Sequence, residues 1–170
     1  MNSAVLLPAT LFLLFALTEG GNVNLKWSDC GGAHGKTTGL TPDSLPLGKT
    51  TRTTGTATID EAVSGGAFEI DLKAEILHET YSGDLCSGKS FPLPLDTGSI
   101  KWDGVKCPVA SGPMTVPIDL QLSSSIPTAL QRVTITVKTT DSNKNSLLCM
   151  QIQTSPGDSL DLGNSSSFVV

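Results

Sequence analysis

The feature that most constrains the fold of this chain is a stretch in which apolar residues alternate with charged ones. Phe68, Ile70, Leu72 and Ile76 fall on one parity, and every residue of the other parity between them is charged. Successive side chains of a β-strand point to opposite faces, so this pattern predicts one strand over residues 66–81 with a dry face and a wet face. The dry face has to be covered, either by a filled core or by a cavity that holds a ligand.

The first twenty residues have the composition of a secretory signal peptide. An apolar run over residues 4–16 is followed by Thr18 and Gly20, small residues that suit a cleavage site. The run is too short to span a bilayer. We therefore expect residues 1–20 to be a signal peptide and the mature protein to be secreted or to reside in the lumen of a lysosome or vacuole.

The size and charge of the mature chain limit what it can be. About 150 residues remain after the signal peptide, which is enough for one domain with a core of its own. The formal net charge is −5 for the whole chain, and removing Glu19 with the signal peptide leaves −4. No basic cluster is present, so nucleic acid is a poor partner and so, at neutral pH, is a constitutively anionic membrane.

The mature part contains four cysteines, Cys30, Cys86, Cys107 and Cys149. In an oxidising compartment, two disulfides are the expected state of four such cysteines. Their spacing alone leaves all three pairings open. No pair has CxxC spacing, so we expect no structural zinc site and no other metal site.

The remaining periodic segments predict further short strands and no amphipathic helix. Residues 114–122 and 133–137 alternate, and the turn-forming sequence at 141–145 leads into a partner strand at 148–152. About seven short strands predict an all-β fold, an immunoglobulin-like antiparallel β-sandwich of two sheets. A true immunoglobulin domain is the rival, and it lacks support because no tryptophan stands on a strand between the two cysteines that would pack across the sheets.

Two segments have the composition of loops. Residues 81–113 are rich in Gly, Pro, Ser and Asp and include two of the cysteines. Such a loop either forms the mouth of a binding site or folds its apolar residues back onto the sandwich. Residues 156–170 lose all periodicity and read as a disordered tail, in which Asn164 begins a glycosylation sequon.

No arrangement of residues in the sequence is typical of an enzyme. The chain has neither a GxSxG nor an HExxH motif. Glu69, Asp71 and Glu75 share the wet parity of the first strand, where solvation explains them without catalysis. His78 continues the dry parity, either as a pH sensor or as an ordinary hydrogen-bonded histidine at a strand end. We therefore expect no enzymatic activity and no cofactor.

Four motifs, taken in order, resemble the ML-domain lipid-recognition family. They are WSDCG at 27–31, PDSLPLG at 42–48, Cys-Pro at 107–108 and LLCMQI at 147–152. The resemblance covers residues 22–154 and extends to lysosomal sterol carriers, the ganglioside activator and fungal phosphatidylglycerol/phosphatidylinositol transfer proteins. It implies that residues 21–155 form a sandwich whose sheets are splayed around a lipid. It also implies disulfides between Cys30 and Cys149 and between Cys86 and Cys107.

With this resemblance, the apolar parity of the strands is expected to line a lipid cavity and not to fill a core. The expected lining residues are Phe68, Ile70, Leu72, Ile76, Met114, Val116, Ile118, Leu120, Val133, Ile135, Val137, Leu148, Met150 and Ile152. The expected mouth of the cavity consists of Leu93, Leu95, Ile100 and Trp102. The implied partners are a sterol, phospholipid or glycolipid and a membrane that is contacted transiently, and the sequence names no membrane-protein acceptor of the lipid.

A function of a different class is also consistent with the sequence. A secreted β-sandwich can recognise a receptor or a surface glycan through its loops and hold no lipid. Alternation alone does not separate the two hypotheses, because a filled core and a lined pocket have the same period.

Overall fold

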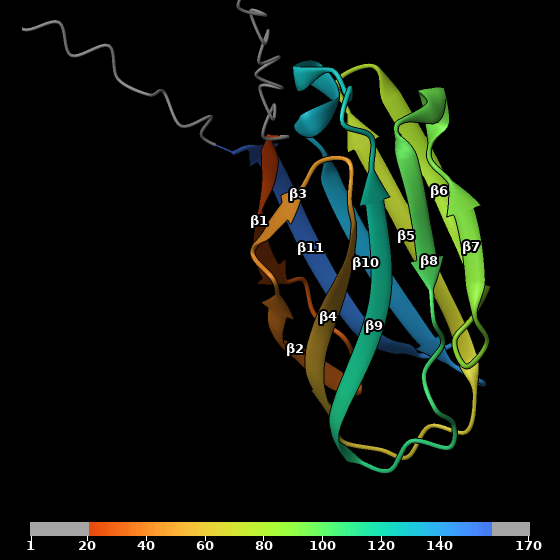
Figure 1. The fold of residues 1–170 in the computed structure, drawn as a ribbon. Helices are drawn as coiled ribbons and strands as arrows, with labels where there is room; N and C mark the ends of the chain where they lie inside the picture. The colour runs from red at the N-terminus through yellow and green to blue at the C-terminus, as the bar shows by residue number, and fades with distance from the viewer. Residues whose placement is uncertain (1–20, 158–170) are drawn as a thin grey trace, which may run out of the picture.

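The computed structural model describes residues 21–157, which form an antiparallel sandwich of two β-sheets (Figure 1). One sheet has six strands in the order β3-β1-β11-β10-β5-β6, and the other has five in the order β2-β4-β9-β8-β7. The prediction of an all-β, immunoglobulin-like sandwich is confirmed. The expected signal peptide and, from residue 158 on, the expected tail with the sequon at Asn164 lie outside the described residues. Pro156, where that tail is expected to begin, instead ends a strand and pairs with Val23.

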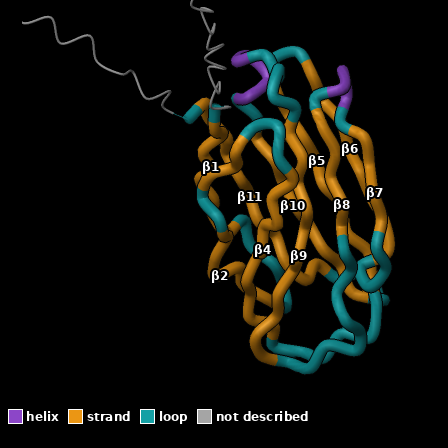
Figure 2. Tube along the Cα trace, in the orientation of Figure 1, coloured by secondary structure: helices purple, strands orange, loops and turns teal. Residues whose placement is uncertain are grey.

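The strands of each sheet come from distant parts of the chain. The six-stranded sheet consists of β1 (Asn22–Asp29), β3 (Ser44–Pro46), β5 (Gly66–Ala74), β6 (Leu77–Asp84), β10 (Thr134–Asp141) and β11 (Ser146–Pro156). The five-stranded sheet consists of β2 (Gly35–Thr41), β4 (Thr50–Ile59), β7 (Lys89–Pro92), β8 (Gly98–Trp102) and β9 (Gly112–Leu122). Two short 3-10 helices, η1 (Pro94–Asp96) and η2 (Thr128–Gln131), lie at the same end of the sandwich (Figure 2). Within residues 21–157, no helix is long and apolar enough to cross a membrane.

The three strands predicted in the second half of the chain are present as β9, β10 and β11. The turn between β10 and β11 depends on the carboxylate of Asp141. Its Oδ1 accepts hydrogen bonds from the backbone N–H groups of Asn143 at 2.9 Å and Asn145 at 2.7 Å. These bonds close the turn and set the hairpin register, as the turn-forming residues predict.

The alternating stretch forms two strands instead of one. β5 ends at Ala74, and Glu75 and Ile76 make a tight turn, so that Ala74 pairs with Leu77 across the new hairpin. Because the chain reverses there, Leu77 takes the inward position and Ile76 is left 78% exposed. The prediction that Ile76 continues the dry face is therefore wrong, and so is the inward placement of His78, which pairs with Lys73 and is exposed.

The prediction that residues 81–113 form a long loop is also wrong. β7 and β8 lie within it and form an antiparallel hairpin at the edge of the five-stranded sheet, with Phe91 opposite Ile100. Trp102, at the end of β8, is 0% exposed, and its Nε1 donates to the carbonyl of Leu85 at 3.1 Å. Trp102 is therefore a core residue and not part of a mouth, in line with the alternative that this segment packs back onto the sandwich.

Two disulfides tie the sandwich together, and none of the described cysteines is free. Cys30, just after β1, is bonded to Cys149 in β11, at a sequence separation of 119. Cys86 and Cys107 bridge the segment that holds the β7–β8 hairpin, at a separation of 21. This pairing is the one that the family resemblance implies.

Candidate functional site

Two adjoining apolar cavities lie between the sheets. We call one the middle cavity, because it lies between β4 and β9 on one side and β10 and β11 on the other. We call the other the end cavity, because η2 and the segment at η1 line it. Their void volumes are about 700 and 720 Å³, with open solvent at the openings included. Ligand pockets are concave and mostly apolar, and both cavities have this character.

Three side chains form the boundary between the two cavities. Ile100 of β8, Leu120 of β9 and Ile135 of β10 line both of them. They come from both sheets, so the boundary crosses the interior of the sandwich. A ligand that occupies the two cavities together has to pass between these three residues.

Most of the predicted lining residues lie around the cavities, although the role of each in binding a lipid stays a prediction. The middle cavity is lined by Ile70, Val116, Ile118, Leu120, Ile135, Val137, Leu148, Met150 and Ile152. Leu72 and Val133 line the end cavity alone. Phe68 and Met114 are buried in the apolar cluster beside the cavities and line neither, and Ile76 is exposed in the β5–β6 turn.

Of the four residues predicted to form the mouth, two line a cavity and two do not. Leu93 lines the end cavity, and Ile100 lines both cavities. Leu95, in η1, is 71% exposed. Trp102 lies in the core and lines neither cavity, and Ile100 is itself only 3% exposed.

Small side chains on β4 create much of the space in the middle cavity. Thr53, Gly55 and Ala57 point inward from this strand, opposite β11 of the other sheet. At Gly55, a Cβ atom would lie 3.4 Å from the methyl carbon of Met150, so even an alanine would begin to fill the gap. Sequence reasoning missed these residues as lining because the Thr-rich segment has little apolar content. Short residues on the inward parity were the available signal, since large side chains there would close the space.

The end cavity is lined by residues from both edges of the six-stranded sheet and from the 3-10 helices. Val23, Leu25 and Leu45 contribute from β1 and β3, and Leu77 from β6. Sequence reasoning missed these residues because β1 and β3 are far from the alternating stretch in sequence. None of the described residues that line either cavity is charged.

Nearly all polar side chains in the cavity walls have partners within the protein. In the end cavity, the Oγ1 atoms of Thr97 and Thr154 each donate to a backbone carbonyl at 2.7 Å. In the middle cavity, Thr53 donates to the carbonyl of Ile118 at 2.9 Å. Thr139, 3% exposed, is the exception, because its Oγ1 has no hydrogen-bond partner among the described residues. A buried hydroxyl without a partner destabilises a fold by about 1–3 kcal/mol.

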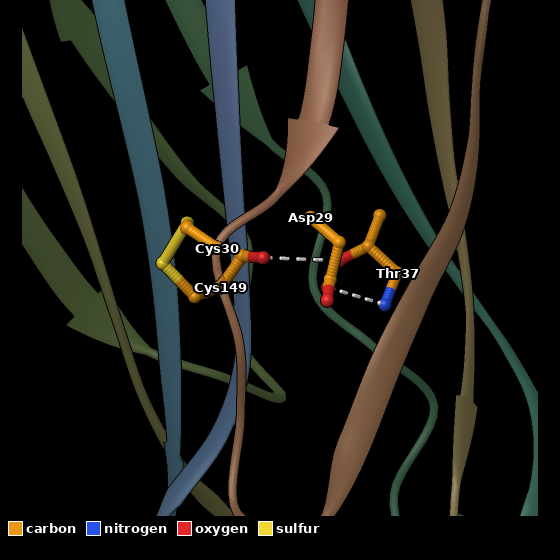
Figure 3. Close-up of a disulfide and its surroundings, with 4 residues drawn as sticks. All are labelled: Asp29, Cys30, Thr37 and Cys149. Carbon is orange, nitrogen blue, oxygen red and sulfur yellow. Dashed lines mark hydrogen bonds between the residues drawn. A yellow bond between two sulfur atoms is a disulfide. The ribbon is translucent and has the colours of Figure 1, made fainter.

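Thr37, another middle-cavity residue, is held beside the first disulfide (Figure 3). Its Oγ1 donates to the carbonyl of Cys149 at 3.2 Å, and its backbone N–H donates to Oδ1 of Asp29 at 2.9 Å. The close-up shows one bond between Thr37 and the carbonyl of Cys149 and the other between Thr37 and Asp29. Both bonds fix edge strand β2 against β1 and β11, which closes the sandwich at this edge.

Charged side chains gather on the outer face of the five-stranded sheet. Arg52 of β4 donates to Asp119 of β9 at 2.8 Å and also contacts Asp103, and Lys101 lies 2.7 Å from Asp103. The hydrogen bond from Arg52 holds the pKa of the Asp119 carboxyl below its ordinary value. This network is separated from the cavities by the sheet itself.

A second charged group sits on the β5–β6 hairpin. Asp71 accepts from Lys73 at 2.9 Å and lies 2.5 Å from Nε2 of His78. The hydrogen bond from Lys73 lowers the pKa of the Asp71 carboxyl, and the contact with His78 adds to this effect. In the described part of the chain, no group of three His, Cys, Asp or Glu side chains is placed to hold a metal ion.

Comparisons with known proteins agree with this architecture. The family model of the ML domain matches residues 24–155. The fold is similar to the crystal structure of a Niemann-Pick type C2 protein from the Japanese carpenter ant, with a TM-score of 0.53 and 13% sequence identity over 78% of this chain and 99% of that one. Chicken MD-1 complexed with lipid IVa matches with a TM-score of 0.49 and 14% identity over 79% of this chain and 90% of that one. No curated protein matches the sequence significantly.

Proposed function

Because the chain belongs to the ML-domain family, we propose that it binds a sterol, a phospholipid or a glycolipid between its two sheets and transfers this lipid between membranes. The observation that carries the proposal is the pair of adjoining, uncharged cavities inside the sandwich. In this proposal the protein is a carrier and not an enzyme, and it needs no cofactor.

The driving force for binding is the removal of the apolar part of the lipid from water. Burial of each methylene group contributes about 0.8 kcal/mol. The apolar walls of the two cavities, with Ile70 and Ile135 among them, supply the surface that replaces water. In this proposal the polar head of the lipid stays at the end cavity, beside the exposed residues Ile76 and Leu95.

The end cavity also lies beside the most exposed large apolar side chains of the described residues, Ile76 and Leu95. Each is next to cavity-lining residues, Ile76 before Leu77 and Leu95 after Leu93 and Pro94. The β5–β6 turn and η1 lie at the same end of the sandwich (Figure 1). In this proposal the two side chains enter the membrane surface transiently while a lipid moves into or out of the cavity.

Secretion, or delivery to the lumen of a lysosome or vacuole, completes the proposal. The two disulfides support it, because disulfides persist in oxidising compartments. Residues 1–20 would act as the signal peptide, residues 21–155 as the lipid-binding domain, and Asn164 as a glycosylation site beyond that domain.

Two measurements test the proposal. Native mass spectrometry of gently purified protein, followed by solvent extraction, should find a lipid bound to the folded chain and identify its class. A liposome-transfer assay at neutral and acidic pH should show movement of that lipid from donor to acceptor vesicles. An empty protein that transfers nothing at either pH contradicts the proposal and favours an interaction module that recognises a receptor or glycan through its loops.

A further inference from the structure

Among the described residues, the hydroxyl group of Thr139 is the one buried side-chain polar group that the protein leaves without a partner. Thr139 is 3% exposed and lines the middle cavity. From this placement we propose that Thr139 binds an oxygen-bearing group, a hydroxyl or a carbonyl, on the buried apolar part of the ligand. The inference rests on the proposed lipid-binding function and specifies the chemistry of the lipid.

The hydroxyls of two other buried threonines in the same cavity have hydrogen-bond partners within the protein. The hydroxyls of Thr37 and Thr53 donate to the backbone carbonyls of Cys149 and Ile118. These bonds are internal to the protein and are complete without a ligand. Thr139 is different, because its nearest cross-strand partners are the apolar residues Phe68 and Leu148.

The strand itself does not require a hydroxyl at this position. Val137, two residues earlier, lines the same cavity from the same strand. Valine and threonine have similar shapes and both favour β-strands, so valine at position 139 would serve the fold equally well. A buried hydroxyl without a partner destabilises the protein. A ligand oxygen that faces Thr139 supplies the missing partner and gives the residue a function.

The position of Thr139 along β10 determines which part of the lipid it meets. Ile135 stands at the boundary of the two cavities, and Thr139 lies four residues further along the strand, about 13 Å away at 3.3 Å per residue. With the lipid head at the end cavity, as the proposed function has it, Thr139 faces the opposite end of the ligand. The expected ligand is therefore a lipid with an oxygen far from its head, such as an acyl chain hydroxylated near its end or a sterol hydroxylated on its side chain.

The test compares two pairs of probes in a competition-binding assay. One pair is a long-chain fatty acid with and without a hydroxyl near the end of its chain, and the other is a sterol with and without a side-chain hydroxyl. The wild-type protein should prefer the hydroxylated member of at least one pair by roughly three- to tenfold, the effect of one net hydrogen bond. The pair that shows the preference identifies the source of the oxygen.

Three variants test whether the preference for the hydroxylated probe depends on the hydroxyl group of Thr139. Thr139→Val should abolish it, and Thr139→Ser, which keeps a hydroxyl, should retain it. Thr136→Val makes the same change on the opposite parity of the same strand, outside both cavities, and should also retain it. Thermal unfolding of each variant checks that it folds, and Thr139→Val should be at least as stable as the wild type because it loses an unpartnered hydroxyl.

The outcomes separate this inference from the function on which it rests. If the wild type binds both members of each pair equally, the partner of Thr139 is only a water molecule and the inference is overturned. A preference that survives in Thr139→Val also overturns it. If the wild type binds none of the four lipids, this inference is overturned, and native mass spectrometry of the gently purified protein decides separately whether the lipid-binding proposal fails as well. The wild-type comparison decides the matter even if one of the variants does not fold.

Discussion

The indole ring of Trp102 lies flat against the phenyl ring of Phe68, with 4.1 Å between the ring centroids and an angle of 14° between the planes. Phe68 belongs to β5 of the six-stranded sheet and Trp102 to β8 of the five-stranded sheet. Phe91 of β7 meets the edge of Phe68 at 6.1 Å and 81°. The aromatic contact therefore holds the two sheets together at a place where no cavity separates them.

Truncation of the Trp102 side chain should lower the stability of the whole domain. We expect Trp102→Ala to lower the free energy of unfolding by about 3–5 kcal/mol, as for other large buried aromatic residues. Urea denaturation followed by circular dichroism measures the change. Leu95→Ala is the matched control, because Leu95 is exposed and its truncation should change stability by about 0.5 kcal/mol or less. A small loss for Trp102→Ala would contradict its placement in the core.

Enlargement of a side chain should distinguish the cavity from the packed core. Ile70 lines the middle cavity, so Ile70→Trp can place its ring in the void; we expect a folded protein that no longer carries lipid. Met114 is 3% exposed and lines neither cavity. Met114→Trp should therefore overpack the core and destabilise it by about 1–3 kcal/mol. Thermal unfolding and lipid extraction measure both effects, and equal destabilisation by the two substitutions would show that the space around Ile70 cannot accept a ring.

The two disulfides should contribute unequally to stability. In the chain-entropy model, a bridge that closes a longer loop restricts the unfolded chain more. The separation is 119 residues for Cys30–Cys149 and 21 for Cys86–Cys107. Replacing both cysteines of the first pair by serine should cost about 4–5 kcal/mol, and of the second pair about 3 kcal/mol. Guanidinium denaturation of the two double variants tests the order, and a reversed order would contradict the model.

Charged residues at the tips of the β5–β6 turn and η1 should slow lipid transfer. In the variant Ile76→Asp/Leu95→Asp, two exposed apolar side chains become anionic, so insertion into a bilayer becomes unfavourable. We expect slower transfer between liposomes and unchanged thermal stability, because neither side chain is buried. Thr115→Asp, on an exposed position of β9, adds a charge away from this end and is the control. Unchanged transfer by the double variant would exclude these tips as the membrane contact.

The ion pair between Arg52 and Asp119 should make stability depend on pH in the acid range. The hydrogen bond from Arg52 lowers the pKa of Asp119 in the folded state. A group with a depressed folded-state pKa stabilises the fold in full above its unfolded pKa of about 3.9 and loses this contribution as the pH falls through the folded value. The difference in melting temperature between the wild type and Asp119→Asn should thus be constant above about pH 5 and shrink below about pH 4.

Salt provides the control for this prediction. The pair is on the outer face of the sheet, and the side chain of Arg52 is 58% exposed. Salt at about 1 M should therefore screen the interaction and reduce the difference at neutral pH. A difference that is independent of both pH and salt would mean that the substitution acts through packing.

The strands of the second half of the chain could be predicted from the sequence because their local signals agree. Alternation marks β9, β10 and β11, and Asp141 followed by polar residues marks the turn between the last two. The motifs around Cys30 and Cys149 carried the family resemblance that the matching family model supports. In each case, local chemistry and tertiary structure favour the same conformation.

Other features depend on contacts that a local pattern does not contain. The turn at Glu75 and Ile76 contains no Gly, Pro or Asn, and Ile76 extends the apolar parity of β5 into it. The only local signal of the reversal was the change of parity at the adjacent apolar residue Leu77. β7 and β8 are short and lie in a Pro- and Gly-rich segment that is also typical of a loop. The cavities themselves arise because small side chains of β4, such as Gly55, face larger ones across the sandwich.

The boundary between the two cavities has a consequence for the length of lipid that the protein can accommodate. A short ligand fits on one side of Ile100, Leu120 and Ile135, whereas a ligand long enough to occupy both cavities has to extend past these three residues. The two isoleucines are branched at Cβ and have little freedom about χ1, but Leu120 is not. Of the three side chains between the cavities, Leu120 is therefore the one that rotates most readily while both sheets stay in place.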